Sequence, residues 1–229
     1  MTVLVCVWGV APGAGKSTLC SALSATLAEA GLRVDHFREE EILTRPEFGC
    51  VAAQFRRAGT VTLSALLESS ARFADAIRAG GADVVVADAL APYVPTLLAL
   101  GHSEQAIDAF AVELAGTLAS VSPVLVYLDG DAGTALARAA EREGPQWLDG
   151  YIDKLARYQV QPPVSDLASA IGYLRRERAV TLAVARRMSW PVVAVEGATE
   201  LSPDQVLAIA ERGLRTWLAQ LRTQATLDD

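Results

Sequence analysis

The residues from 9 to 18 have types and a spacing that suit phosphate chemistry. They read Gly-Val-Ala-Pro-Gly-Ala-Gly-Lys-Ser-Thr and follow a short apolar run. Glycines at such a turn let backbone N–H groups face an anion, and a helix that starts there adds its partial positive charge. A lysine next to the last glycine can reach the terminal phosphates of a nucleotide, and the following hydroxyl can bind Mg²⁺. The segment therefore predicts a nucleotide phosphate site with bound Mg²⁺.

Particular residues of this segment are expected to contact the phosphates and Mg²⁺. We expect the phosphate contacts to come from Pro12, Gly13, Ala14, Gly15, Lys16, Ser17 and Thr18. Ser17 is the expected Mg²⁺ ligand, and Thr18 is expected to face the α-phosphate or to cap the helix. The usual pattern has a glycine where this chain has Val10, and Gly9 stands one residue early. A different shape is expected for the loop entry for that reason. The plainer alternative is a glycine-rich strand-to-helix turn with a chance lysine.

Carboxylates follow two of the expected strands, where open parallel sheets bind ligands. Glu39 comes after the second strand and is expected to orient or deprotonate an acceptor hydroxyl, with Asp35 and Glu40 as alternatives. The simpler reading is that 39–41 form a solvated first helical turn. Asp88 ends a Val-Val-Val-Ala run, where a buried charge must be paired or used. We expect it to hold Mg²⁺ through water or to meet the acceptor.

Arginines after the fourth expected strand could stabilise a phosphoryl group in transfer. Arg138 and Arg142 are four residues apart and so share one face of a helix, although they could also be a solvated pair beside glutamates. A second basic cluster, at 175, 176 and 178, is better explained as helix surface. His36 and His102 have no partner at metal-ligand spacing, so zinc is not expected.

The elements that must position these residues alternate between strand and helix, the pattern of a parallel sheet covered on both faces. Strands are expected at 3–8, 33–37, 83–88, 124–128 and 192–195. Helices are expected at about 16–30, 62–79, 103–120, 131–143, 165–187 and 203–222, with a frayed tail after 222. A lid and added helices are expected within about 138–190, with the added helical pair in the long segment 144–190. One α/β domain spans the 229 residues on this reading.

Composition limits the partners. The net charge of −7 weighs against nucleic acid and against a membrane surface, which need a basic footprint, so a small-molecule partner is expected. No stretch of 18 apolar residues occurs, and the first residues are expected to be a core strand and not a signal peptide. A cytoplasmic location with reduced cysteines at 6, 20 and 50 is the expectation.

Three passages, beyond the phosphate loop, resemble the thymidylate kinase and deoxynucleoside kinase families. Residues 37–40, Phe-Arg-Glu-Glu, are similar to their Arg-Glu-Pro element, and 126–131, Val-Tyr-Leu-Asp-Gly-Asp, lead to Arg138 and Arg142 as in their lid passage. Asp88 stands where these families carry an acidic residue, but Ala89 and Leu90 replace the arginine that follows it. That difference weighs against a nucleoside monophosphate acceptor.

The resemblance implies a P-loop NTPase fold, three αβα layers with a five-stranded parallel sheet in the order 2-3-1-4-5, and a possible homodimer through 62–79 and 103–120. The expected activity is transfer of the ATP γ-phosphate to a hydroxyl of a nucleoside-like, sugar or antibiotic-like molecule. One alternative is a nucleoside monophosphate kinase, for which Arg38, Arg56 or Arg72 would bind the acceptor phosphate. Another is an ATP-dependent switch protein without a small acceptor.

Overall fold

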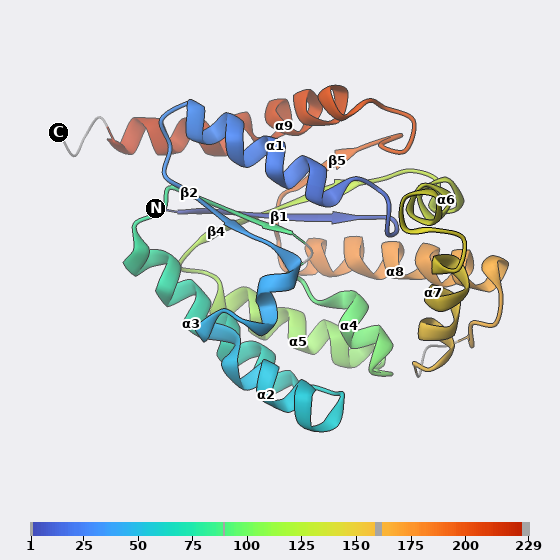
Figure 1. The fold of residues 1–229 in the computed structure, drawn as a ribbon. Helices are drawn as coiled ribbons and strands as arrows, with labels where there is room; N and C mark the ends of the chain where they lie inside the picture. Colours follow the sequence, from blue (N-terminus) through green and yellow to red (C-terminus); the bar gives the residue numbers. More distant parts are fainter. Residues whose placement is uncertain (1, 89, 159–161, 226–229) are drawn as a thin grey trace.

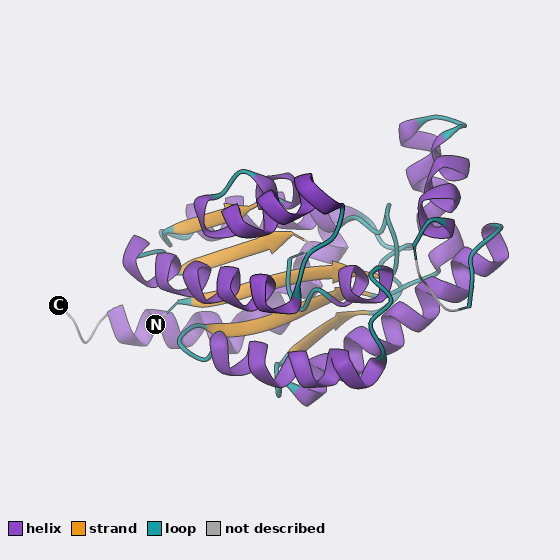
Figure 2. Cartoon of the chain, turned by 90° about the horizontal axis from the view of Figure 1, so that it is seen from below, coloured by secondary structure: helices purple, strands orange, loops and turns teal. Residues whose placement is uncertain are grey.

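The computed structural model describes residues 2–88, 90–158 and 162–225, and the side chains of these residues as far as 219. Five strands form one parallel sheet in the order β2-β3-β1-β4-β5, as expected (Figure 1). The strands are β1 (Val3–Gly9), β2 (Val34–Phe37), β3 (Val84–Asp88), β4 (Ser122–Leu128) and β5 (Val192–Val195). Figure 2 shows them side by side with all arrowheads toward one end. Side chains that follow the strands therefore meet at one edge of the sheet.

Helices cover both faces of the sheet, which gives three layers (Figure 1). On one face, α1 (Lys16–Glu29) packs against α9 (Pro203–Ala225). On the other face, α5 (Glu104–Thr117) packs between α3 (Leu63–Gly80) and α8 (Leu167–Arg187). Near the carboxyl edge, α6 (Ala132–Glu143) and α7 (Trp147–Ala156) pack against each other and against α8. The carboxyl edge, by which we mean the end of the sheet where all the strands finish, is thus surrounded by α6, α7 and the start of α8.

The strand residues explain the two-sided cover. Every residue of β3, and all but one of β1, is buried, because these central strands have helices on both faces. In β5, which is the outermost strand beside β4, exposed and buried residues alternate. The expectation of strands buried on both faces is therefore wrong for β5, and also for β2, where three of the four residues are only half-buried. Beneath β2, the rings of Phe37, Phe48 and Phe73 pack with centroids 5.2–5.6 Å apart.

Several short elements were not expected. These are the 3₁₀ helix η2 (Pro46–Phe48) and the helices α2 (Gly49–Ala58) and α4 (Val94–Ala99), whereas the 3₁₀ helix η1 (Glu39–Leu43) contains the helical turn that the simpler reading of 39–41 expected. Each is too short for a helical period to stand out in the sequence. The last helix continues to Ala225, so a frayed tail from 223 is wrong there, and 226–229 lie outside the described residues. None of the described helices has both the length and the apolar character needed to cross a membrane.

Candidate functional site

The glycine-rich loop joins the end of β1 to the start of α1 at the carboxyl edge. Gly13 and Gly15 have φ values of 85° and 96°, which residues with a side chain rarely adopt. Helix α1 begins at Lys16, so its first N–H groups, which have no partner within the helix, lie at the loop. Ser17 and Thr18 are exposed. The loop therefore has the backbone form that suits an anion.

The unusual entry of the loop has a structural explanation. Val10 is buried, and its N–H donates to the Leu128 carbonyl 3.0 Å away. A Cβ on Gly9 would lie 3.0 Å from the Cβ of Ala14 and 3.3 Å from that of Leu128. The backbone at residue 9 therefore lies too close to Ala14 and Leu128 for a side chain, whereas position 10 can carry a valine.

Helix α6 packs directly on the loop. Its first turn is held by the Asp131 carboxylate, which accepts the Thr134 N–H at 2.7 Å. A Cβ on Gly13 would lie 2.1 Å from the Ala135 carbonyl oxygen and 3.0 Å from the Ala139 nitrogen. Gly13 thus meets the backbone of α6, whereas a Cβ on Gly15 would have no atom of the described residues within 4 Å apart from its chain neighbours.

The loop opens on a cavity of about 740 Å³, a size that suits small-molecule sites. Two strand ends contribute Glu39 and Asp88 to its wall. The opposite wall comes from α4, α7 and α8, with Thr96 and a set of aromatic side chains. The aromatic residues of the lining are Trp8, Phe37, Trp147, Tyr151, Tyr158 and Tyr173. One cavity therefore joins the glycine-rich loop to the carboxylates and to an aromatic wall.

Asp88 is the most enclosed of the expected site residues. Its side chain is 3% exposed, and Oδ1 has no hydrogen-bond partner among the described residues. The carboxylate lines the cavity at the end of β3. A buried carboxylate oxygen without a protein partner is costly unless a ligand, an ion or water satisfies it.

Three carboxylates were considered near the end of β2, and the structure separates them. Glu39 is exposed and lines the cavity. Both oxygens of Asp35 accept hydrogen bonds from the Arg45 guanidinium at 2.7 Å, and neither Asp35 nor Glu40 belongs to the cavity wall. Glu39 is therefore the carboxylate of this group that can meet a molecule in the cavity.

The expected arginine pair is divided by the structure. Arg142, near the end of α6, lines the cavity, and its Nε donates to Glu143 at 2.8 Å. Arg138 is exposed and does not belong to the cavity wall. Lys154 of α7 lines the cavity instead. Both lysines of the chain, Lys16 and Lys154, thus face the same cavity, which the sequence analysis did not anticipate.

The second basic cluster has structural partners. Arg178 forms a two-pronged ion pair with Asp129, at the end of β4, and one of its bonds, Nε to Oδ1, is 2.7 Å long. This guanidinium lowers the pKa of Asp129. Arg176 donates to Glu104 of α5 at 3.1 Å, and Arg175 is exposed. Arg176 and Arg178 therefore join α8 to its neighbours, so the helix-surface explanation fits the exposed Arg175 and not the half-buried Arg178.

Between these arginines, Glu177 points into the cavity wall and is 7% exposed. Burial raises its pKa to about 7, against the lowering effects of the Trp8 indole, Lys16 and the Tyr173 hydroxyl. The Trp8 N–H faces this carboxyl but is buried without a hydrogen bond of normal geometry, and the Lys16 ammonium lies 5.8 Å from the centre of the indole. Glu177 was missed because Arg-Arg-Glu-Arg reads as a solvated helix face.

The aromatic wall was also missed. The ring of Trp147 stacks on Tyr151 at a centroid distance of 5.2 Å, and both residues line the cavity. Tyr173 lies four residues before Glu177, on the same face of α8. The available signal was the spacing of aromatic residues within 147–173.

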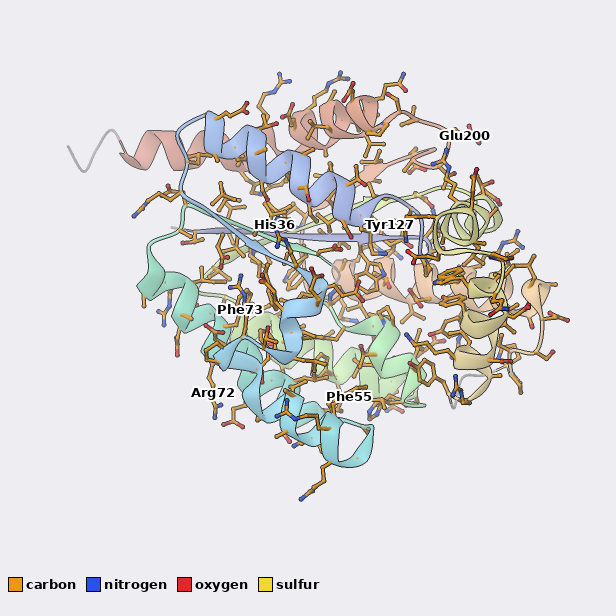
Figure 3. All side chains as sticks on the ribbon, in the orientation of Figure 1. His36, Phe55, Arg72, Phe73, Tyr127 and Glu200 are labelled. Carbon is orange, nitrogen blue, oxygen red and sulfur yellow. The ribbon has the colours of Figure 1, made fainter. Side chains whose placement is uncertain are left out.

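The alternative acceptor residues lie elsewhere. None of Arg38, Arg56 and Arg72 belongs to the cavity wall. Arg72 forms an ion pair with Glu68 on the outer side of α3, and Figure 3 shows Arg72 and Phe55 below the sheet, away from its carboxyl edge. Phe55 is half exposed on α2. The phosphate-binding arginines of a nucleoside monophosphate site are therefore not found at these positions.

Comparison with known proteins adds no family to this description. No protein-family model matches the chain, and no curated protein matches it.

Proposed function

We propose that this chain is an ATP-dependent kinase of the P-loop class, which transfers the γ-phosphate to a hydroxyl group of a small molecule. The observation that carries the proposal is the shared cavity: the glycine-rich loop, Asp88 and Glu39 line one space. Phosphoryl transfer needs charge neutralisation and alignment of donor and acceptor more than covalent chemistry from the protein. A loop for the donor phosphates and a carboxylate for the acceptor hydroxyl, in one cavity, meet that need.

On the donor side, the loop N–H groups and Lys16 bind the phosphates of ATP, and Ser17 with Asp88 holds Mg²⁺. The fit to Mg²⁺ rests on the buried Oδ1 of Asp88, which has no hydrogen-bond partner in the part of the chain that the structure describes, and on the exposed hydroxyl of Ser17. Bound Mg²⁺ would neutralise phosphate charge. The described residues contain no cluster of three or more His, Cys, Asp or Glu that could hold a metal, and Mg²⁺ at nucleotide sites commonly uses one or two protein ligands with phosphates and water.

On the acceptor side, Glu39 accepts the proton of the reacting hydroxyl or orients it. Its place at the end of β2 and in the cavity wall supports this role, whereas Asp35 is already held by Arg45. Arg142 and Lys154 supply positive charge from the lid region, 138–190, to the phosphoryl group. Helices α7 and α8 exclude water, which would otherwise compete with the acceptor.

The acceptor that fits this proposal carries no phosphate. Among the described residues, the cavity wall contains three carboxylates, from Glu39, Asp88 and Glu177, and its three cations, Lys16, Arg142 and Lys154, have roles toward ATP. The arginines considered for an acceptor phosphate, at 38, 56 and 72, lie outside the cavity. We therefore favour an alcohol over a nucleoside monophosphate.

The test is ADP release by the purified protein with ATP, Mg²⁺ and a panel of nucleosides, nucleoside monophosphates, sugars and aminoglycoside-type antibiotics. We expect stimulation by a phosphate-free acceptor and its loss in Lys16→Ala, with the folded state retained in circular dichroism. Tight ATP binding without stimulation by any acceptor would favour a nucleotide-dependent switch. Full activity of Lys16→Ala would refute the assignment of the loop.

A further inference from the structure

Glu177 is a buried carboxylate in the cavity that the proposed transfer does not use. Its side chain belongs to the buried face of α8, and a charged carboxylate in such a place is costly without a counter-charge. Groups on every element packed around it affect its ionisation or are affected by it. They are Trp8 of β1, Lys16 of α1, Tyr127 of β4, Tyr151 of α7 and Tyr173 of α8 itself.

Lys16 is the cation of this set. The arginines next to Glu177 in the sequence are held elsewhere, Arg178 by Asp129 and Arg176 by Glu104. The Lys16 ammonium also lies against the face of the Trp8 indole. Lys16, together with the Trp8 indole, therefore favours the ionised form of Glu177, and it is the same lysine that is proposed to bind nucleotide phosphates.

We propose that Glu177 is the counter-charge of Lys16 when no nucleotide is bound, and that it takes up one proton when nucleotide phosphates reach Lys16. This inference rests on the proposed nucleotide binding. The phosphates neutralise Lys16 and bring negative charge toward a carboxylate that is shielded from water, and both effects favour its protonated form. The proton comes from the buffer and forms an O–H bond on the carboxyl group of Glu177.

The consequence is a pH-dependent affinity. With a pKa of about 7 in the nucleotide-free protein, Glu177 is mostly ionised at pH 8 and mostly protonated at pH 6. Binding at pH 8 must include the protonation, so affinity falls by about tenfold between pH 6 and pH 8. Glutamine in place of Glu177 removes this step.

The test is isothermal titration calorimetry of MgADP binding at pH 6 and pH 8, in two buffers of different ionisation enthalpy. The proteins are the wild type, Glu177→Gln and a matched control, Glu200→Gln, whose exposed side chain lies beyond the cavity wall (Figure 3). Wild type and control should take up about one proton more than Glu177→Gln at pH 8. Glu177→Gln should bind MgADP about tenfold more tightly than wild type at pH 8 and equally at pH 6.

The outcomes separate the two proposals. Nucleotide binding by the wild type without proton uptake at pH 8 overturns the role of Glu177 and leaves the kinase proposal standing. Weaker binding by Glu177→Gln at both pH values indicates a structural role and also overturns it. No nucleotide binding by the wild type refutes the proposed function and this inference together. The buffer dependence of the wild type decides the matter even if Glu177→Gln does not fold.

Discussion

Replacing Gly13 with alanine tests the contact between the glycine-rich loop and α6. The new methyl group would meet the Ala135 carbonyl oxygen at 2.1 Å, well inside contact distance, and the obstacle is backbone that cannot rotate away. The φ of 85° adds strain of its own for any residue with a Cβ. The fold can accept the substitution only if α6 moves away from the loop.

Gly15→Ala is the matched control, because it shows how much unfolding free energy the backbone strain alone costs. Its φ of 96° imposes similar backbone strain, about 1–2 kcal/mol, but its Cβ would meet no atom of the described residues within 4 Å apart from its chain neighbours. Gly13→Ala carries that strain plus the cost of an overpacked contact, about 1–3 kcal/mol. We therefore expect Gly13→Ala to lose about 2–5 kcal/mol of unfolding free energy and Gly15→Ala about 1–2 kcal/mol.

Urea unfolding followed by circular dichroism measures both losses, with the midpoint and slope fitted for each variant. Equal losses for the two variants would show that α6 does not press on residue 13 as described. A larger loss for Gly15→Ala than for Gly13→Ala would refute the reasoning entirely.

Three further predictions follow from the charged side chains. Because burial raises the pKa of Glu177 to about 7, its ionisation opposes folding as pH rises above about 4.5. Glu177→Gln should therefore have about 3 kcal/mol more unfolding free energy than wild type at pH 8 and the same unfolding free energy at pH 4, as measured by urea unfolding. The pKa of Asp129 is lowered by Arg178, so the ionised carboxylate stabilises the fold at pH values above the ordinary pKa, and this stabilisation is lost on acidification. The wild type should therefore lose more stability below about pH 4 than Asp129→Asn, as measured by thermal melts across that range. Arg142→Met should lower kcat about 10²-fold, and Arg138→Met should leave kcat unchanged, because only Arg142 of the two lines the cavity. Equal effects of the two substitutions in the ADP-release assay would contradict this difference.

The fold was predictable where the sequence has a strong local pattern. Valine-rich runs before the loop and before Asp88 identified the central strands, because strands covered on both faces need continuous apolar residues. The strand order came from the resemblance, since no local pattern encodes which strands are neighbours. Helix α4 could not be predicted, because Val94–Ala99 spans less than two turns.

The site was predictable where chemistry depends on neighbours in the sequence, and not where it depends on tertiary packing. The glycine-rich loop is one continuous segment. The choice of Glu39 over Asp35 depends on Arg45, ten residues from Asp35, and the separation of Arg142 from Arg138 depends on where α6 meets the cavity. Such choices are made by partners that the sequence alone does not place.

Glu177 shows how that packing creates chemistry from an ordinary charged run. Successive residues on a helix point about 100° apart, so once Arg178 is fixed to Asp129 at the end of β4, Glu177 must face a different neighbour. That neighbour is the cavity wall beside Lys16. A glutamine would fill the same space without the cost of ionisation, about 3 kcal/mol at pH 8, which is a large part of the stability of a typical domain. A carboxylate retained at that cost is expected where its charge is used, and the lysine it faces is the one proposed to hold the phosphates.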